Sequence, residues 1–150
     1  MSEERKRVLF VCIGNACRSQ MAEAFARAYG GDVLIPASAG LSPGYRVADD
    51  TLRAMGEKNL DLRDHFPKSI KQLSRWRFDL IINMSGYALP EDIQVPTIDW
   101  DVEDPVFMDF EHHCAVRDRI ERLVMELIVK LRREKEEPHF RGQGSRDYGS

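Results

Sequence analysis

The stretch that decides the fold is Val8-Leu9-Phe10-Val11-Cys12-Ile13-Gly14-Asn15-Ala16-Cys17-Arg18-Ser19. Its first four residues form an apolar run typical of a buried strand, and a helix-like run from Gln20 to Tyr29 follows it. The pattern therefore predicts a strand, a tight turn and a helix. Gly14 and Asn15 are residue types that adopt the positive φ angles needed to close such a turn.

The chemistry of this turn favours binding of a tetrahedral oxyanion. Its N–H groups and the positive end of the following helix converge on one point. The Arg18 guanidinium can bind two oxygens of the same group. The same field favours the thiolate form of Cys12, which makes Cys12 a candidate nucleophile, whereas an inert buried cysteine is the alternative. The predicted binding residues are Ile13, Gly14, Asn15, Ala16, Cys17, Arg18 and Ser19.

Strand-like runs alternate with helix-like segments along the chain, which is typical of parallel sheets built from βαβ units. The predicted strands are Arg7 to Val11, Val33 to Ser38, Phe78 to Met84 and Val95 to Ile98. Pro36 and Pro96 cannot donate to a ladder, so the second and fourth strands are expected at the edges. The predicted fold is α/β, a single three-layer domain with a four-stranded parallel sheet of order 2-1-3-4 and helices on both faces. Cys12 then lies at the switch point, where such sheets bind ligands.

Apolar stripes predict the helices. Three shorter stripes comprise Met21, Phe25 and Ala28; Ala48, Leu52 and Met55; and Ile70, Leu73 and Trp76, the last starting near Pro67. The final helix has an apolar stripe of Val116, Ile120, Leu123, Leu127 and Leu131, with Arg117, Asp118, Arg122, Glu126 and Lys130 expected to face water. The domain is expected to span residues 1–137. Residues 138–150 are polar and glycine-rich and are expected to be a disordered tail.

Composition limits the class of protein. A chain of 150 residues is expected to form one domain, and its net charge of −3 gives no general attraction to nucleic acid or to a membrane. No apolar stretch approaches the ~20 residues of a membrane span, and the polar start lacks the apolar segment of a signal peptide. Three cysteines do not make a disulfide framework, and a reactive thiol needs a reducing compartment. These features predict a cytoplasmic enzyme.

Residues Val8 to Ala24 resemble the signature of the low-molecular-weight protein tyrosine phosphatases and their arsenate reductase relatives. The resemblance extends to Ser38-Ala39-Gly40, to Trp100-Asp101-Val102-Glu103-Asp104-Pro105 and to the long final helix. It implies a phosphatase that hydrolyses phosphotyrosine-type monoesters through a Cys12 phosphoenzyme, with no metal or other cofactor. The implied partners are a phosphorylated protein substrate and oxyanions such as phosphate and arsenate.

The leaving oxygen of a phosphate ester requires a proton donor. The candidates all lie in the loop after the fourth strand, at the same sheet end as Cys12: Asp99, Asp101, Glu103, Asp104 and Asp109. Pro105 restricts the backbone of Asp104, and neighbouring carboxylates favour its protonated form. The family also has its acid in an Asp-Pro pair, so Asp104 is the predicted general acid. Ser19 is expected to donate a hydrogen bond to the Cys12 thiolate.

Other interpretations stay open. An arsenate reductase would use the same loop but needs further thiols, and the thioredoxin-coupled members carry a cysteine pair after the third strand, where residues 83–90 of this chain have none. We therefore favour the phosphatase. A non-catalytic phosphoprotein-binding module would be expected to lose the nucleophile or the acid.

Several side chains have open roles. Cys17 is a candidate disulfide partner of Cys12, whereas a metal site at His112, His113 and Cys114 is disfavoured. His65 is expected to be structural. Tyr45 or Phe107 could form aromatic walls for phosphotyrosine. The small side chain of Ala16 leaves another phosphoamino acid, such as phosphoarginine, as an alternative substrate.

Overall fold

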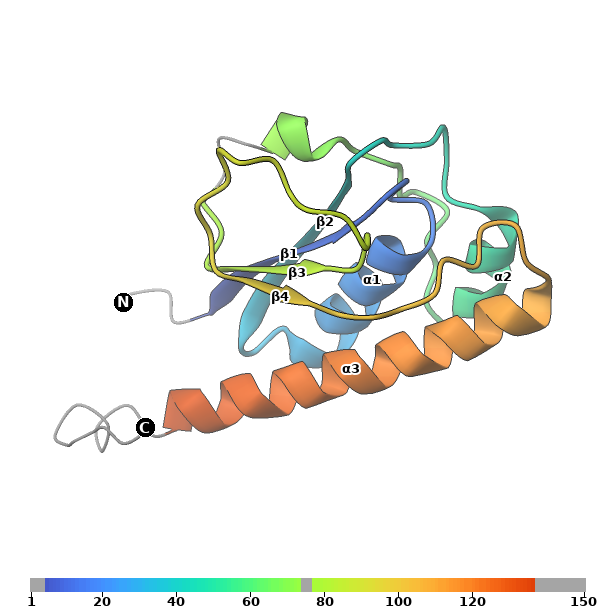
Figure 1. The fold of residues 1–150 in the computed structure, drawn as a ribbon. Helices are drawn as coiled ribbons and strands as arrows, with labels where there is room; N and C mark the ends of the chain where they lie inside the picture. Colours follow the sequence, from blue (N-terminus) through green and yellow to red (C-terminus); the bar gives the residue numbers. More distant parts are fainter. Residues whose placement is uncertain (1–4, 74–76, 137–150) are drawn as a thin grey trace, which may run out of the picture.

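The sheet determines the architecture. A computed structural model describes residues 5–73 and 77–136. Four parallel strands form one sheet of order β2-β1-β3-β4 (Figure 1), which confirms the predicted α/β class and strand order. Pro36 lies within an edge strand and Pro96 directly precedes the other, as expected for residues without an N–H. The bounds are β1 Lys6–Cys12, β2 Leu34–Gly40, β3 Leu80–Asn83 and β4 Thr97–Asp99.

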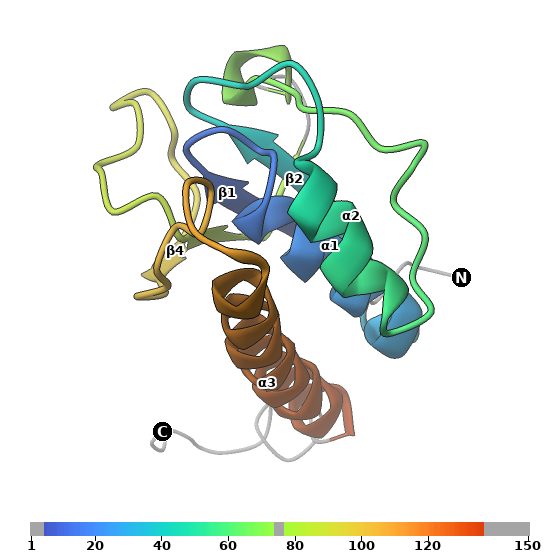
Figure 2. The same cartoon turned by 90° about the vertical axis from the view of Figure 1, so that its right-hand side faces the viewer.

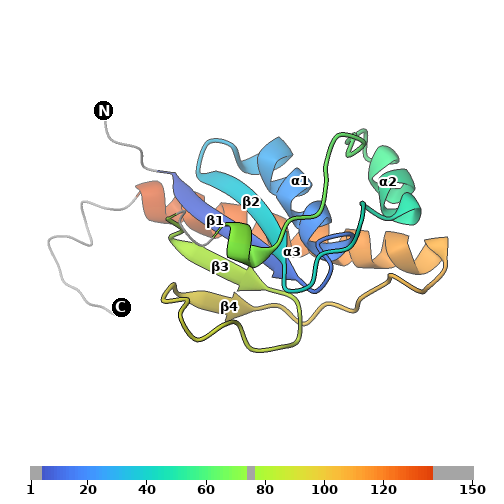
Figure 3. The same ribbon diagram turned by 90° about the horizontal axis from the view of Figure 1, so that it is seen from above.

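Helices cover both faces of the sheet. Helices α1 (Arg18–Gly30) and α3 (Phe110–Glu136) lie together against one face, and α2 (Asp49–Gly56) packs on α3. The short 3₁₀ helix η1 (Ile70–Leu73) lies on the opposite face, as the view from above makes clear (Figure 3).

Successive side chains of β1 enter two separate apolar clusters. Val8, Phe10 and Cys12 belong to the cluster beneath α1 and α3. Leu9 and Val11 belong to the smaller cluster that includes η1. Because side chains alternate along a strand, a strand buried on both faces reads as a continuous apolar run. This explains why residues 8–11 contain no polar residue.

The structure corrects several sequence-based details. Arg117 does not face water: it is 7% exposed and donates to the Ala54 main-chain oxygen and to Glu57 at 2.9 and 2.7 Å. In the turn, Asn15 has a φ of 51°, but Gly14 has no positive φ, so only one of the two expected residues is needed there. Helix α1 begins at Arg18, two residues earlier than predicted. The predicted helix residue Trp76 and the tail 138–150 lie outside the described residues.

Three loops meet at the carboxyl end of β1. Figure 2 shows the loop after β1 next to the segment that follows β2 and the segment that precedes α3. Hydrogen bonds join the first two: Gly44 N–H donates to the Gly14 oxygen and Ala48 N–H to the Ala16 oxygen, at 2.9 and 3.1 Å. This is where ligands bind in open α/β sheets. Among the described residues, no helix is long and apolar enough to cross a membrane.

Candidate active site

Asn15 shapes the loop after β1. It is fully buried and adopts a left-handed backbone conformation. Its Nδ2 donates to Ser19 Oγ at 2.7 Å, and its Oδ1 accepts from the Lys68 N–H at 2.9 Å. These bonds stabilise a backbone conformation that non-glycine residues rarely adopt. The loop is thereby held curled around Cys12.

The Cys12 sulfur lies inside this loop and accepts hydrogen bonds from it. Asn15 N–H donates to Cys12 Sγ at 3.2 Å, and Ser19 Oγ lies 2.9 Å from the same sulfur. Ser19 receives the Asn15 amide proton, so its own hydroxyl proton is available to the sulfur. Two donors are therefore directed at this one sulfur, where they can stabilise negative charge when the sulfur attacks or leaves.

Arg18 is anchored on one side and unsatisfied on the other. Its NH1 donates to the main-chain oxygens of Met84 and Val102, the latter at 3.0 Å. The side chain is buried, yet its Nε has no hydrogen-bond partner among residues 5–73 and 77–136. Leaving a buried donor unpaired costs free energy. Such a donor is typical of a group that binds a ligand. The Nε and NH2 donors form the fork that binds two oxygens of an oxyanion.

Asp104 lies at this fork. Its Oδ2 is 3.3 Å from Arg18 NH2, and its Oδ1 accepts from the Val106 N–H at 3.1 Å. The carboxyl group is therefore held by its own loop on one oxygen and is directed at the arginine with the other. An oxyanion bound by Arg18 would have Asp104 beside it, within reach of a leaving oxygen.

A second layer of hydrogen bonds, which sequence reasoning missed, supports the loop from behind. Gln20 is buried, and its Nε2 donates to the main-chain and side-chain oxygens of Asn15, both at 3.2 Å. His65 Nδ1 donates to Gln20 Oε1 at 3.0 Å, which agrees with its expected structural role. The sequence signal was a polar glutamine in the first turn of α1, directly after the loop.

Cys17 is the other thiol of the loop. Burial raises its pKa to about 11, and the nearby charges of Asp104 and Cys12 act in the same direction, whereas a hydrogen bond from Thr51 opposes them. Cys17 is thus a protonated and poorly nucleophilic thiol at neutral pH. Neither Cys12 nor Cys17 is in a disulfide.

Other predicted residues lie elsewhere. Tyr45 and Phe107 are fully exposed and do not enclose the loop. Asp99 and Asp101 line a neighbouring pocket, and Asp109 pairs with His112 at 2.6 Å. Cys114, on α3, lies near Glu57. The described residues contain no cluster of side chains suited to a metal ion.

Comparisons with known proteins agree with this geometry. A family model described as low molecular weight phosphotyrosine protein phosphatase matches residues 7–137. A glutaredoxin arsenate reductase from Synechocystis sp. is 33% identical over 130 residues, covering 84% of this chain and 98% of that protein.

Two solved structures are similar over most of this chain. One, an arsenate reductase in the phosphate binding state, is 32% identical, with a TM-score of 0.76, and the match covers 84% of this chain and 98% of that one. A low molecular weight protein tyrosine phosphatase from T. tengcongensis is 28% identical, with a TM-score of 0.70, and covers 83% and 99%. The two relatives with the higher identity, at 33% and 32%, are both named as arsenate reductases. Their names support the arsenate reductase alternative more than the phosphatase interpretation.

Proposed function

Since this chain belongs to the low-molecular-weight phosphotyrosine protein phosphatase family, we propose that it is a Cys12-dependent phosphatase acting on phosphotyrosine-type monoesters of proteins. The observation that supports this most strongly is that Cys12, Arg18 and Asp104 lie in one site. In that site the Nε donor of Arg18 is buried and unpaired. Every group that phosphate ester hydrolysis needs is supplied by this chain.

The reaction has two steps. The Cys12 thiolate attacks phosphorus, the bond to the ester oxygen breaks, and Asp104 protonates that oxygen. Arg18 and the loop N–H groups stabilise the charge on the equatorial oxygens. Water then attacks the phosphocysteine, Asp104 takes a proton from it, and the sulfur leaves as a thiolate. The Ser19 hydroxyl, 2.9 Å from the sulfur, stabilises that leaving group.

Arsenate reduction is the second candidate, and the relatives named above support it. After Cys12 displaces water from arsenate, a second thiol must attack the Cys12 sulfur so that arsenic leaves as arsenite and a disulfide forms. Within this chain that thiol could only be Cys17 or Cys114. Cys17 is buried with its pKa raised to about 11, and Cys114 lies on α3 beside Glu57. Reduction would therefore need an external thiol.

A side-by-side assay separates the two. The purified protein is expected to hydrolyse an aryl phosphate without metal, and arsenate is expected to inhibit competitively because it shares the shape and charge of phosphate. Arsenite formation is measured in parallel with thioredoxin, and with glutathione and glutaredoxin. The control is Cys12→Ser, which should lose both activities but still bind phosphate. Multiple-turnover arsenite formation faster than aryl phosphate hydrolysis would instead establish the reductase.

A further inference from the structure

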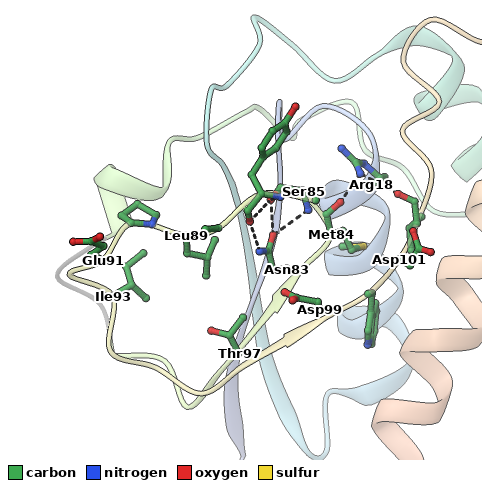
Figure 4. Close-up of a pocket in the computed structure, with 16 residues that line it drawn as sticks. Arg18, Asn83, Met84, Ser85, Leu89, Glu91, Ile93, Thr97, Asp99 and Asp101 are labelled. Carbon is green, nitrogen blue, oxygen red and sulfur yellow. Dashed lines mark hydrogen bonds between the residues drawn. The ribbon is translucent and has the colours of Figure 1, made fainter.

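A pocket of about 900 Å³ adjoins the oxyanion loop and has no role in the chemistry above. It lies between the segment after β3 and the β4 strand with its following residues, and Arg18 forms one of its walls (Figure 4). The same Met84 and Val102 whose oxygens anchor Arg18 also line it. A ligand in the oxyanion loop can therefore extend past Arg18 into this pocket.

The lining combines apolar walls with an acidic rim. Leu89, Ile93 and Trp100 contribute partly buried apolar surface. Glu91, Asp99 and Asp101 are exposed carboxylates of the lining. Within the described part of the chain, no hydrogen bond or ion pair is formed by these three side chains.

Arg18 is the cation of the lining, and it is already committed to Asp104 and to two main-chain oxygens. Arg119 binds the main-chain oxygen of Asp101 at 2.8 Å but does not line the pocket. The free part of the pocket is consequently negative. It favours a cationic group with an aliphatic stem, which is the chemistry of a lysine or arginine side chain.

The edge of the sheet indicates a peptide as the carrier of that group. Trp100 N–H donates to the Asn83 oxygen and Ile81 N–H to the Pro96 oxygen, so alternate main-chain groups of β4 face β3. The main-chain groups of Thr97 and Asp99 consequently face the open edge, while their side chains point into the pocket (Figure 4). An extended peptide can bind such an edge through main-chain hydrogen bonds.

The unpaired Arg18 Nε supplies the second half of the recognition. It is a buried donor at the junction of loop and pocket, and it requires an acceptor such as a phosphate oxygen. A ligand that satisfies both features carries an oxyanion and a cation a short distance apart.

We propose that this pocket is a specificity subsite that selects phosphorylated peptides with a lysine or arginine close to the phosphorylated residue. This inference rests on the proposed phosphatase function. It adds a substrate preference set by Glu91, Asp99 and Asp101, outside the groups that carry out hydrolysis.

The test uses phosphotyrosine peptides that differ only in whether lysine or glutamine occupies one of the three positions on either side of the phosphotyrosine. At one or two of these positions, lysine is expected to raise kcat/KM about ten-fold, the sum of a few exposed charge interactions. The ratio should fall when ionic strength rises from about 0.05 to about 0.5 M, because the Debye length shortens roughly threefold and exposed charges are screened.

Variants locate the effect. Asp99→Asn combined with Asp101→Asn should reduce the lysine-to-glutamine ratio most of the way toward one, with Glu91 left as the remaining carboxylate of these three. Asp92→Asn, which removes the exposed carboxylate next to Glu91 but outside the lining, should leave the ratio unchanged. The subsite would be overturned if the unmodified enzyme gave a lysine-to-glutamine ratio near one at every position. It would also be overturned if Asp92→Asn lowered this ratio as much as the double variant does.

A binding measurement separates this inference from the proposed function. Calorimetric titration of the same peptides into Cys12→Ser reports the lysine preference without turnover. If no peptide or aryl phosphate is hydrolysed but the preference in binding is present, the phosphatase assignment fails and the subsite stands. If hydrolysis occurs without any preference in binding, the subsite fails and the phosphatase stands.

Discussion

At the scale of single residues, oxyanion binding and proton transfer are assigned to different side chains of the candidate site. Arg18 is held by two main-chain oxygens and needs an acceptor on its Nε side, whereas Asp104 is held by the Val106 N–H and can donate or accept a proton with its second oxygen. Substitutions at these residues should therefore change different kinetic quantities.

Asp104→Asn should reduce hydrolysis of phenyl phosphate about 10²- to 10³-fold and that of p-nitrophenyl phosphate much less, because only the poorer leaving group needs a proton in the transition state. The kcat/KM values for the two substrates measure this, because they report formation of the phosphocysteine, whereas its later hydrolysis, in which Asp104 also takes part, is common to both substrates. Asp109→Asn, in the same loop but paired with His112, serves as the control and should behave like the unmodified enzyme. Equal losses for both substrates would mean that Asp104 positions the loop instead.

Cys17 should make stability depend on alkaline pH. Its pKa is about 11 in the fold against 9.0 for an ordinary thiol, so between these values the folded state holds a proton that the unfolded state has lost. The stabilisation is complete below pH 9 and disappears as pH rises toward 11, by at most ~2.7 kcal/mol.

Urea unfolding of the unmodified protein and of Cys17→Ala at pH 8, 9.5 and 11 measures this effect. The difference in the free energy of unfolding between the two proteins should shrink as pH rises, and subtracting the variant removes the contribution of other groups. A difference that is constant with pH would contradict the assigned burial of the thiol.

At the scale of secondary-structure elements, the end of β2 supports the oxyanion loop from the side. A Cβ added to Gly40 would lie 2.6 Å from the Ile13 oxygen and 2.9 Å from the Asn15 nitrogen. Both atoms belong to the backbone of the loop, so they cannot move aside without changing its curvature. The Ser38-Ala39-Gly40 motif thus acts by permitting close approach of two backbones.

Gly40→Ala should consequently lower kcat by about 10²-fold, because small displacements of catalytic groups are costly. Gly44→Ala is the matched control: its added Cβ would be 3.9 Å from the Gly14 oxygen, an ordinary contact. Circular dichroism and aryl phosphate turnover of both variants test this. Comparable activity of the two folded variants would show that the loop tolerates the displacement.

At the scale of the whole molecule, Arg18 joins segments that are far apart in sequence. Its oxygen partners lie 66 and 84 residues away, and filling its unpaired donor should strengthen the fold that holds them. Oxyanion binding is therefore expected to stabilise the entire domain.

Inorganic phosphate at about 100 times its Kd should add ~2.7 kcal/mol of stability and raise Tm by roughly 5 to 10 °C. Scanning calorimetry with and without phosphate gives the shift. Cys12→Ser should keep it, whereas Arg18→Lys, which retains the charge but loses the fork, should lose most of it. A full shift in Arg18→Lys would assign the binding to the loop N–H groups alone.

The sequence by itself determined the strand, loop and helix around Cys12 and the order of the sheet. This information is local: an apolar run, turn residues and a helical stripe lie within residues 8–29, and Pro36 and Pro96 exclude central strands. The same local pattern also gave the hydrogen bond between Ser19 and Cys12.

Only the tertiary structure decided how Arg18 is anchored, that Arg117 is buried, that Gln20 supports Asn15 and where the acidic pocket lies. Main-chain oxygens such as those of Met84 and Val102 are present at every position and leave no trace in residue identity. Arg117 occupies a helix position that its charge predicts to be exposed, but the Ala54 oxygen and Glu57 of another element compensate that charge. Such partners become known only when segments distant in sequence are brought together, because their energies depend on contact and not on local pattern.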